Sequence, residues 1–143
     1  MTVEVIKREF EQSPYLQHLG ITIQSFEEGN VELKLIVENF LLNKYGTLHG
    51  GVYASMLDLI QRMHLCSVTE TRCKSISSTV HFTAPVKTGA IYAHASIISM
   101  TYKTAFVEGI LRDADGKIIS KGTGTFQLIR VDSKVASALG NRK

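Results

Sequence analysis

The chain of 143 residues has the length of one compact domain, and we expect residues 1–143 to form a single domain. Its formal net charge of +3 comes from scattered Lys and Arg residues, which argues against a nucleic-acid-binding protein and mildly favours a small anionic ligand. No segment approaches the ~18 apolar residues of a membrane span, and the N-terminus lacks the pattern of a signal peptide. The two cysteines, Cys66 and Cys73, do not have a metal-ligand spacing. We therefore expect a cytoplasmic protein with reduced thiols and no membrane partner, with a disulfide between the two cysteines as the alternative.

The first 48 residues combine a helix with a hairpin. Apolar residues at helical spacing predict a short helix over about residues 2–12. Residues 15–19 read as a short apolar turn. Alternating apolar residues in 21–26 and 31–37, on either side of a Gly-Asn turn, predict a β-hairpin. Residues 39–48 have no clear period and are expected to form a loop.

The rest of the chain contains one long helix followed by strands. Apolar residues at three- and four-residue steps from Gly50 to about Val68 predict a helix that is buried on more than one side. Further strands are predicted at 75–84, 91–102, 104–113 and 117–130, and the tail after about residue 131 is expected to be flexible. This order predicts an α+β fold with one antiparallel sheet wrapped around one long central helix.

Four sequence pieces in a fixed order resemble one known family. They are the run Asn43-Lys-Tyr-Gly-Thr-Leu-His49-Gly50-Gly51 with Asp58 on the following helix, Phe82-Thr-Ala-Pro-Val-Lys-Thr-Gly89, Asp115-Gly-Lys117 and Gly122-Thr-Gly-Thr125. Together they resemble the PaaI-like branch of the hotdog-fold thioesterases over about residues 15–130. The resemblance implies a hotdog fold and hydrolysis of an acyl-CoA thioester. It also implies a homodimer with active sites at its interface, with a homotetramer as the alternative, and no metal or cofactor beyond the coenzyme A of the substrate.

The paired glycines at the start of the long helix have a physical meaning of their own. Gly50 and Gly51 carry no Cβ, so a ligand can approach the backbone closely. The first N–H groups of a helix lack intrahelical acceptors and can hold an oxyanion. The competing interpretation is that the pair only lets the helix pack tightly against a strand.

The resemblance implies that Asp58 is the catalytic carboxylate, acting as general base on water or as nucleophile on the thioester carbon. It follows Gly50 by eight residues, which corresponds to about 12 Å along a helix. We therefore expect the helix start of one subunit to face Asp58 of the other across a two-fold axis. The competing interpretation is an ion pair with Arg62, four residues further along the same face.

Five more residues are assigned to the site by the resemblance. His49 is expected to orient the loop and the carbonyl-binding backbone, and Asn43 to hold a lytic water or the substrate carbonyl. Ser75 is expected to orient the water, and Ser77 shares its strand face by two-residue alternation. Lys103 would meet a phosphate of coenzyme A. The structural alternatives are an ordinary turn residue for Asn43, a strand-surface hydroxyl for Ser75 and a solvated side chain for Lys103.

Two other functions fit the same sequence. A hotdog dimer with Asp58 neutralised by Arg62 would bind acyl-CoA without turnover. A hotdog dehydratase fits less well, because the His and acid pattern of those enzymes lies differently in the chain. His64, His81 and His94 have no spacing that indicates a metal.

Overall fold

The computed structural model describes residues 1–130, and the tail expected after about residue 131 lies outside them. The chain starts with two short helices, α1 (Val3–Glu11) and α2 (Pro14–Leu19). Residues 15–19 were expected to form a turn, and this expectation is wrong. The Ser13 hydroxyl accepts a hydrogen bond from the Leu16 N–H, Pro14 occupies the first helical turn, and Gly20 ends α2 in the left-handed conformation. A capping serine, a proline at the helix start and a glycine at its end together specify a helix even at this length.

The six strands form one antiparallel sheet in the order β1-β2-β4-β5-β6-β3. Their bounds lie within two residues of those expected: β1 (Thr22–Glu27), β2 (Asn30–Ile36), β3 (Cys73–Phe82), β4 (Ala90–Met100), β5 (Thr104–Asp113) and β6 (Ile118–Leu128). A 3-10 turn, η1 (Asn39–Leu41), opens the loop that was expected after β2.

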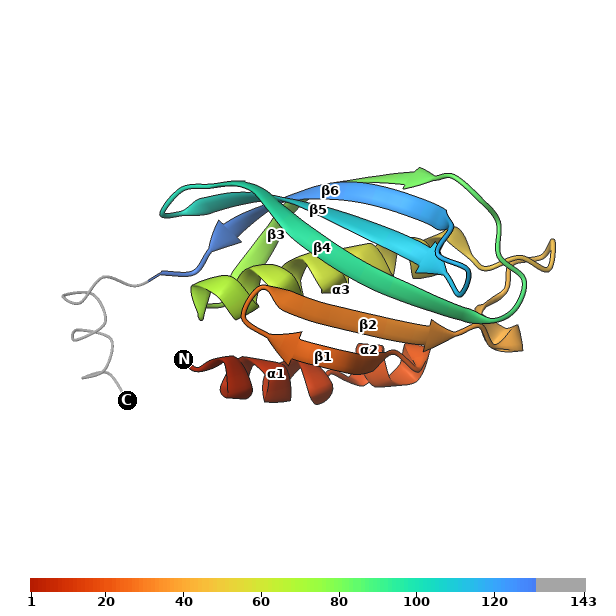
Figure 1. The fold of residues 1–143 in the computed structure, drawn as a ribbon, viewed down its shortest axis with the longest axis horizontal. Coiled ribbons are helices and arrows are strands. Elements are labelled where there is room, and N and C mark those ends of the chain that lie inside the picture. Colours follow the sequence, from red (N-terminus) through yellow and green to blue (C-terminus); the bar gives the residue numbers. More distant parts are fainter. Residues whose placement is uncertain (131–143) are drawn as a thin grey trace.

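The long helix α3 (Gly50–Thr69) lies along the curved inner face of the sheet, as Figure 1 shows. Its inward residues Met56, Ile60 and Met63 are fully buried, and they meet a core of inward-facing strand residues. The helix α1 covers part of the side of α3 that the sheet leaves open (Figure 1). This is the expected α+β arrangement of one sheet around one central helix. Within residues 1–130, no helix has the length and apolarity needed to cross a membrane.

Strand β3 is an edge of the sheet, since it pairs only with β6. Residues 74–79 of β3 are exposed, and Ile76 keeps 57% of its surface accessible. A long exposed edge strand offers unpaired N–H and C=O groups to another strand, and proteins normally cover such an edge. A bulge at Ile76 shifts the register with β6, so that Ser75 pairs with Phe126 and Ser77 pairs with Thr125.

Candidate active site

The start of α3 is capped by the residue before the two glycines. The Nδ1 atom of His49 accepts a hydrogen bond of 2.8 Å from the Gly51 N–H, and the His49 carbonyl accepts one of 2.9 Å from the Val52 N–H. Two of the three first amides of the helix are therefore occupied. Among the atoms of residues 1–130, the Gly50 N–H has no acceptor. Gly50 and Gly51 were both expected to offer N–H donors to an oxyanion, but the hydrogen bond to His49 leaves only the Gly50 N–H of the two free. The expected role of His49 in orienting the carbonyl-binding backbone stays a prediction.

A surface cleft lies beside this free amide. It is lined by Gly50, by the ring of Tyr53, by Phe82 and by the chain around Ala84. The two rings pack edge to face with centroids 5.5 Å apart, and the Tyr53 hydroxyl donates a 2.9 Å hydrogen bond to the Ala84 carbonyl. Burial raises the pKa of Tyr53, which keeps its hydroxyl protonated as the donor. Sequence reasoning missed Tyr53, although its position three residues after Gly50 places both on one side of the helix.

Asn43 lines the same cleft and organises the loop before α3. Its Oδ1 accepts hydrogen bonds from the N–H groups of Tyr45 and Thr47, at 2.9 and 3.2 Å, and its Nδ2 donates to Thr47 Oγ1 at 3.0 Å. Both ends of the amide are therefore used within the loop. This geometry supports a role in holding the loop that presents His49 and Gly50.

Asp58 lies two turns into α3, with its side chain 33% exposed. Its Oδ1 accepts a 2.7 Å hydrogen bond from Ser75 Oγ, and its Oδ2 lies 3.6 Å from Nη1 of Arg62. The ion pair weighed as the competing interpretation therefore exists, but it is long and partly exposed, and such pairs contribute little stability. Asp58 opens onto a second cleft, which Ser55 and Ser78 also line. The carboxylate is thus held at one oxygen and accessible to a ligand.

The β-bulge decides which serine reaches Asp58. Phe126, the partner of Ser75, is buried, so Ser75 lies on the helix-facing side of the sheet. After the bulge Ser77 lies on the opposite face, and Ser78 returns to the cleft of Asp58. The expectation that Ser75 and Ser77 share a face is therefore wrong, because the extra residue breaks the two-residue alternation. Ser78 lines the cleft of Asp58, although the two-residue alternation did not assign it to the site.

The structure thus groups the expected residues into two separate clefts. Asn43, His49 and Gly50 lie at the start of α3, whereas Asp58 and Ser75 lie about 12 Å further along the helix axis. The two clefts share no lining residue. Lys103 is exposed in the turn between β4 and β5 and lines neither of them. In the described part of the chain, no three His, Cys, Asp or Glu side chains are grouped to hold a metal ion.

Comparisons with known proteins agree on one family. A family model described as the thioesterase superfamily matches residues 45–120. Human acyl-coenzyme A thioesterase 13 is 32% identical, with 87% of this chain and 92% of that protein covered. The solved structure of the Escherichia coli PaaI protein of the phenylacetic acid degradation operon has a TM-score of 0.81 at 21% identity, with 87% of this chain and 90% of that chain covered. A thioesterase structure from Haemophilus influenzae has a TM-score of 0.80 at 22% identity, with 91% and 92% covered. These likenesses confirm the expected hotdog fold, and the chain belongs to the thioesterase superfamily, as a thioester hydrolase.

Proposed function

We propose that the protein hydrolyses an acyl-CoA thioester to the free acid and coenzyme A, at sites shared by the two subunits of a homodimer. In each site the Gly50 amide of one subunit faces Asp58 of the other. The separation of the two clefts along α3 carries this proposal, because the amide and the carboxylate of one subunit are too far apart to act on one carbonyl.

The uncovered edge of β3 supports the dimer. A second β3 strand related by a two-fold axis would pair with this edge and extend the sheet from one subunit into the next. The same contact would cover the exposed side chain of Ile76. It would also place β3, which bears Ser75, at the subunit interface beside Asp58.

The reaction needs an oxyanion donor and an activated nucleophile. Asp58 takes a proton from water, or attacks the thioester carbon itself, while the Gly50 N–H stabilises the negative charge that develops on the carbonyl oxygen. The thiolate of coenzyme A then leaves. A thiolate is a good leaving group, so the mechanism requires no strong general acid, metal or added cofactor. The name of the human relative supports coenzyme A as the carrier.

The first experiment measures release of free thiol from a panel of acyl-CoA esters. Turnover of at least one ester is expected, and Asp58→Asn should remove it while leaving the mass of the dimer and the far-UV spectrum unchanged. Wild-type-like turnover by Asp58→Asn would show that the carboxylate is misassigned.

The second experiment tests whether the site is shared. Asp58→Asn and Gly50→Pro are each expected to be inactive, but a mixed dimer of the two contains one intact site. Random reassociation should therefore restore about a quarter of the wild-type rate, since half the dimers are mixed and each carries one site of two. No recovery in a population shown to contain mixed dimers would place both groups in one subunit and overturn the shared site.

Acyl-CoA binding without turnover is the second candidate, favoured by the contact between Arg62 and Asp58. In that case acyl-CoA esters would raise the melting temperature although no ester in the panel released thiol.

Single turnover in ¹⁸O-labelled water separates the two hydrolytic routes, in which Asp58 acts as general base or as nucleophile. Label in the product acid indicates water activated by Asp58, and label in the Asp58 carboxyl indicates a covalent intermediate.

A further inference from the structure

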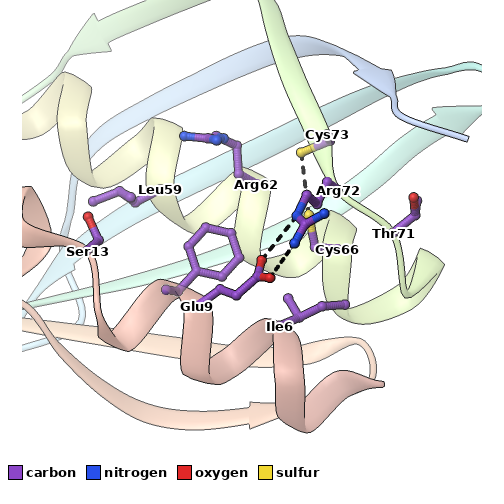
Figure 2. Close-up of a pocket in the computed structure, with 10 residues that line it drawn as sticks. Ile6, Glu9, Ser13, Leu59, Arg62, Cys66, Thr71, Arg72 and Cys73 are labelled. Atoms are coloured by element: carbon purple, nitrogen blue, oxygen red, sulfur yellow. Dashed lines mark hydrogen bonds and ion pairs between the residues drawn. The ribbon is translucent and has the colours of Figure 1, made fainter. Parts of the chain in front are cut away.

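The two cysteines meet beneath the N-terminal helix. Cys66 lies in the last turns of α3 and Cys73 is the first residue of β3. The thiol of Cys66 donates a hydrogen bond to the Cys73 sulfur, with 3.5 Å between the two Sγ atoms, and both residues are free thiols. Figure 2 shows the two sulfurs side by side on the wall of a cavity between α1 and α3.

This cavity gives a small reagent a route to the sulfurs. It has a volume of about 280 Å³, and both cysteines line it although they are 3% and 8% exposed. Glu9 and Arg72 lie at its edge, where they form an exposed ion pair of 2.6 Å (Figure 2). A small peroxide needs only a fraction of this space.

The surroundings shift the pKa values of the two thiols in opposite directions. The pKa of the Cys73 thiol is lowered by the hydrogen bond from Cys66 and by the nearby Arg62 guanidinium, against the opposing effects of burial and of Asp58. The pKa of Cys66 is raised, because its thiol donates to Cys73 and because it is buried. The thiolate is the nucleophilic form of cysteine, so Cys73 is the attacking sulfur and Cys66 the resolving one.

We propose that Cys66 and Cys73 are a redox modification site, which hydrogen peroxide converts into an intramolecular disulfide that changes the contact between Arg62 and Asp58. The Cys73 thiolate attacks one peroxide oxygen, the O–O bond breaks, and a sulfenic acid forms while the departing hydroxide takes up a proton as water. The Cys66 thiol then attacks the Cys73 sulfur, the S–O bond breaks and a second water leaves. Two thiols lose two protons and two electrons, and one peroxide is reduced to two waters.

Arg62 links this pair to the proposed catalytic carboxylate. It lines both the cysteine cavity and the cleft of Asp58, its Nη1 lies 3.6 Å from Oδ2 of Asp58, and it is close enough to Cys73 to lower the pKa of that thiol. In the disulfide the Cys73 sulfur can no longer form a thiolate beside Arg62, and Asp58 is the anion that remains for the guanidinium. A guanidinium held more closely on Oδ2 occupies the oxygen lone pairs that must take a proton from water.

The disulfide also changes the backbone near Ser75. The sulfurs must approach from 3.5 Å to the length of an S–S bond, about 2.05 Å, which draws the start of β3 toward the end of α3. Ser75 follows Cys73 by two residues and holds Oδ1 of Asp58. Both effects act on the same carboxylate, and both slow hydrolysis.

The test treats the full-length protein with hydrogen peroxide in its native state and follows its intact mass. A loss of about 2 Da is expected, reversed by dithiothreitol, and Cys66→Ser, which keeps a hydrogen-bond donor beside Cys73, should instead accumulate the sulfenic acid at Cys73. Formation of sulfinic acid without a disulfide in the wild-type protein, or no oxidation at all, would overturn the modification site.

The functional link rests on the proposed thioesterase activity and is measured separately on the same samples. Oxidation should lower the hydrolysis rate about fivefold, roughly the effect of altering one polar contact of the carboxylate, and dithiothreitol should restore it. In Arg62→Ala the disulfide should still form, with a smaller effect on rate. A disulfide that leaves the wild-type rate unchanged would overturn the link to Asp58. A protein that forms the disulfide but cleaves no thioester even when reduced would overturn the proposed function and the link, and would leave the modification site standing.

Discussion

Ser75 Oγ and Asp58 Oδ1 lie 2.7 Å apart, and this hydrogen bond joins the edge strand β3 to the central helix α3. The bond fixes the orientation of the carboxylate, because Arg62 holds the other oxygen only at 3.6 Å. The position of the edge strand β3 and the orientation of the Asp58 carboxylate are therefore coupled through this hydrogen bond. Pairing of β3 with a second subunit would fix the position of Ser75, and through it the position of Asp58.

This relationship predicts unequal effects of two neighbouring serines. Ser75→Ala should lower kcat by about tenfold, the usual cost of a lost hydrogen bond to a charged group, with little change in KM. Ser77→Ala is the matched control, since the bulge turns Ser77 to the outer face of the sheet, and its rate should stay within about twofold of the wild type. Steady-state kinetics on both variants check this. A larger loss in Ser77→Ala than in Ser75→Ala would show that the face assignment is wrong.

The Gly50 N–H, which has no acceptor among the described residues, allows a second test. Gly50→Pro removes the N–H donor without breaking the helix, because proline is well tolerated at the first helical position and His49 already has the extended backbone that proline requires of its predecessor. Loss of one oxyanion donor lowers kcat by about 10²–10³.

Gly50→Ala keeps the N–H and adds the same Cβ, which would lie 3.3 Å from the exposed ring of Phe82. It should retain most of the activity. Equal losses in the two variants would mean that bulk beside Phe82, and not the missing donor, explains the effect.

Substitutions of Arg62 and Arg72, which both line the cysteine cavity, should differ in their effect on kcat. Arg62→Ala releases Oδ2 of Asp58 and should raise kcat by about two- to fivefold, the range set by a weak, partly exposed ion pair. Arg72→Ala breaks an ion pair with Glu9 instead, without contact to Asp58, and should leave kcat unchanged. A fall in kcat for Arg62→Ala would show that Arg62 positions the carboxylate.

The periodicity of the sequence was sufficient for the fold. Alternation over the strands and three- and four-residue steps over α3 predicted each element to within two residues, because one sheet face and several sides of the helix are buried. The exception is α2, whose six residues are too few to show a period. Its boundaries are specified instead by Ser13, Pro14 and Gly20, and reading these as helix signals would have found it.

The site was predicted less completely, because its details depend on contacts between segments. The resemblance named Asp58 and Ser75, and the structure brings them together. Neither the use of the Gly51 N–H by His49 nor the bulge that turns Ser77 away follows from residue spacing. A bulge inserts one residue into a strand without a clear sequence signal, and from that point onward every expected face is reversed.

The last prediction concerns the glycines that let β3 approach the rest of the sheet. A Cβ on Gly122 would lie 2.7 Å from the carbonyl oxygen of Thr79 in β3 and 3.0 Å from a methyl group of Leu57. The backbone of β3 would have to move, so Gly122→Ala should lower the free energy of unfolding by about 1–3 kcal/mol.

Gly109→Ala is its control on the neighbouring strand, because the three atoms nearest to its Cβ would belong to the side chains of Gln61 and Leu57, at 3.1 Å, so that side chains rather than the backbone of β3 would have to move. Its loss of stability in denaturant unfolding should be the smaller of the two. Movement of β3 also displaces Ser75, so Gly122→Ala should lower kcat as well, even under conditions where the protein is fully folded. A Gly122→Ala protein that is destabilised but keeps the wild-type kcat would show that the position of β3 does not control the orientation of Asp58.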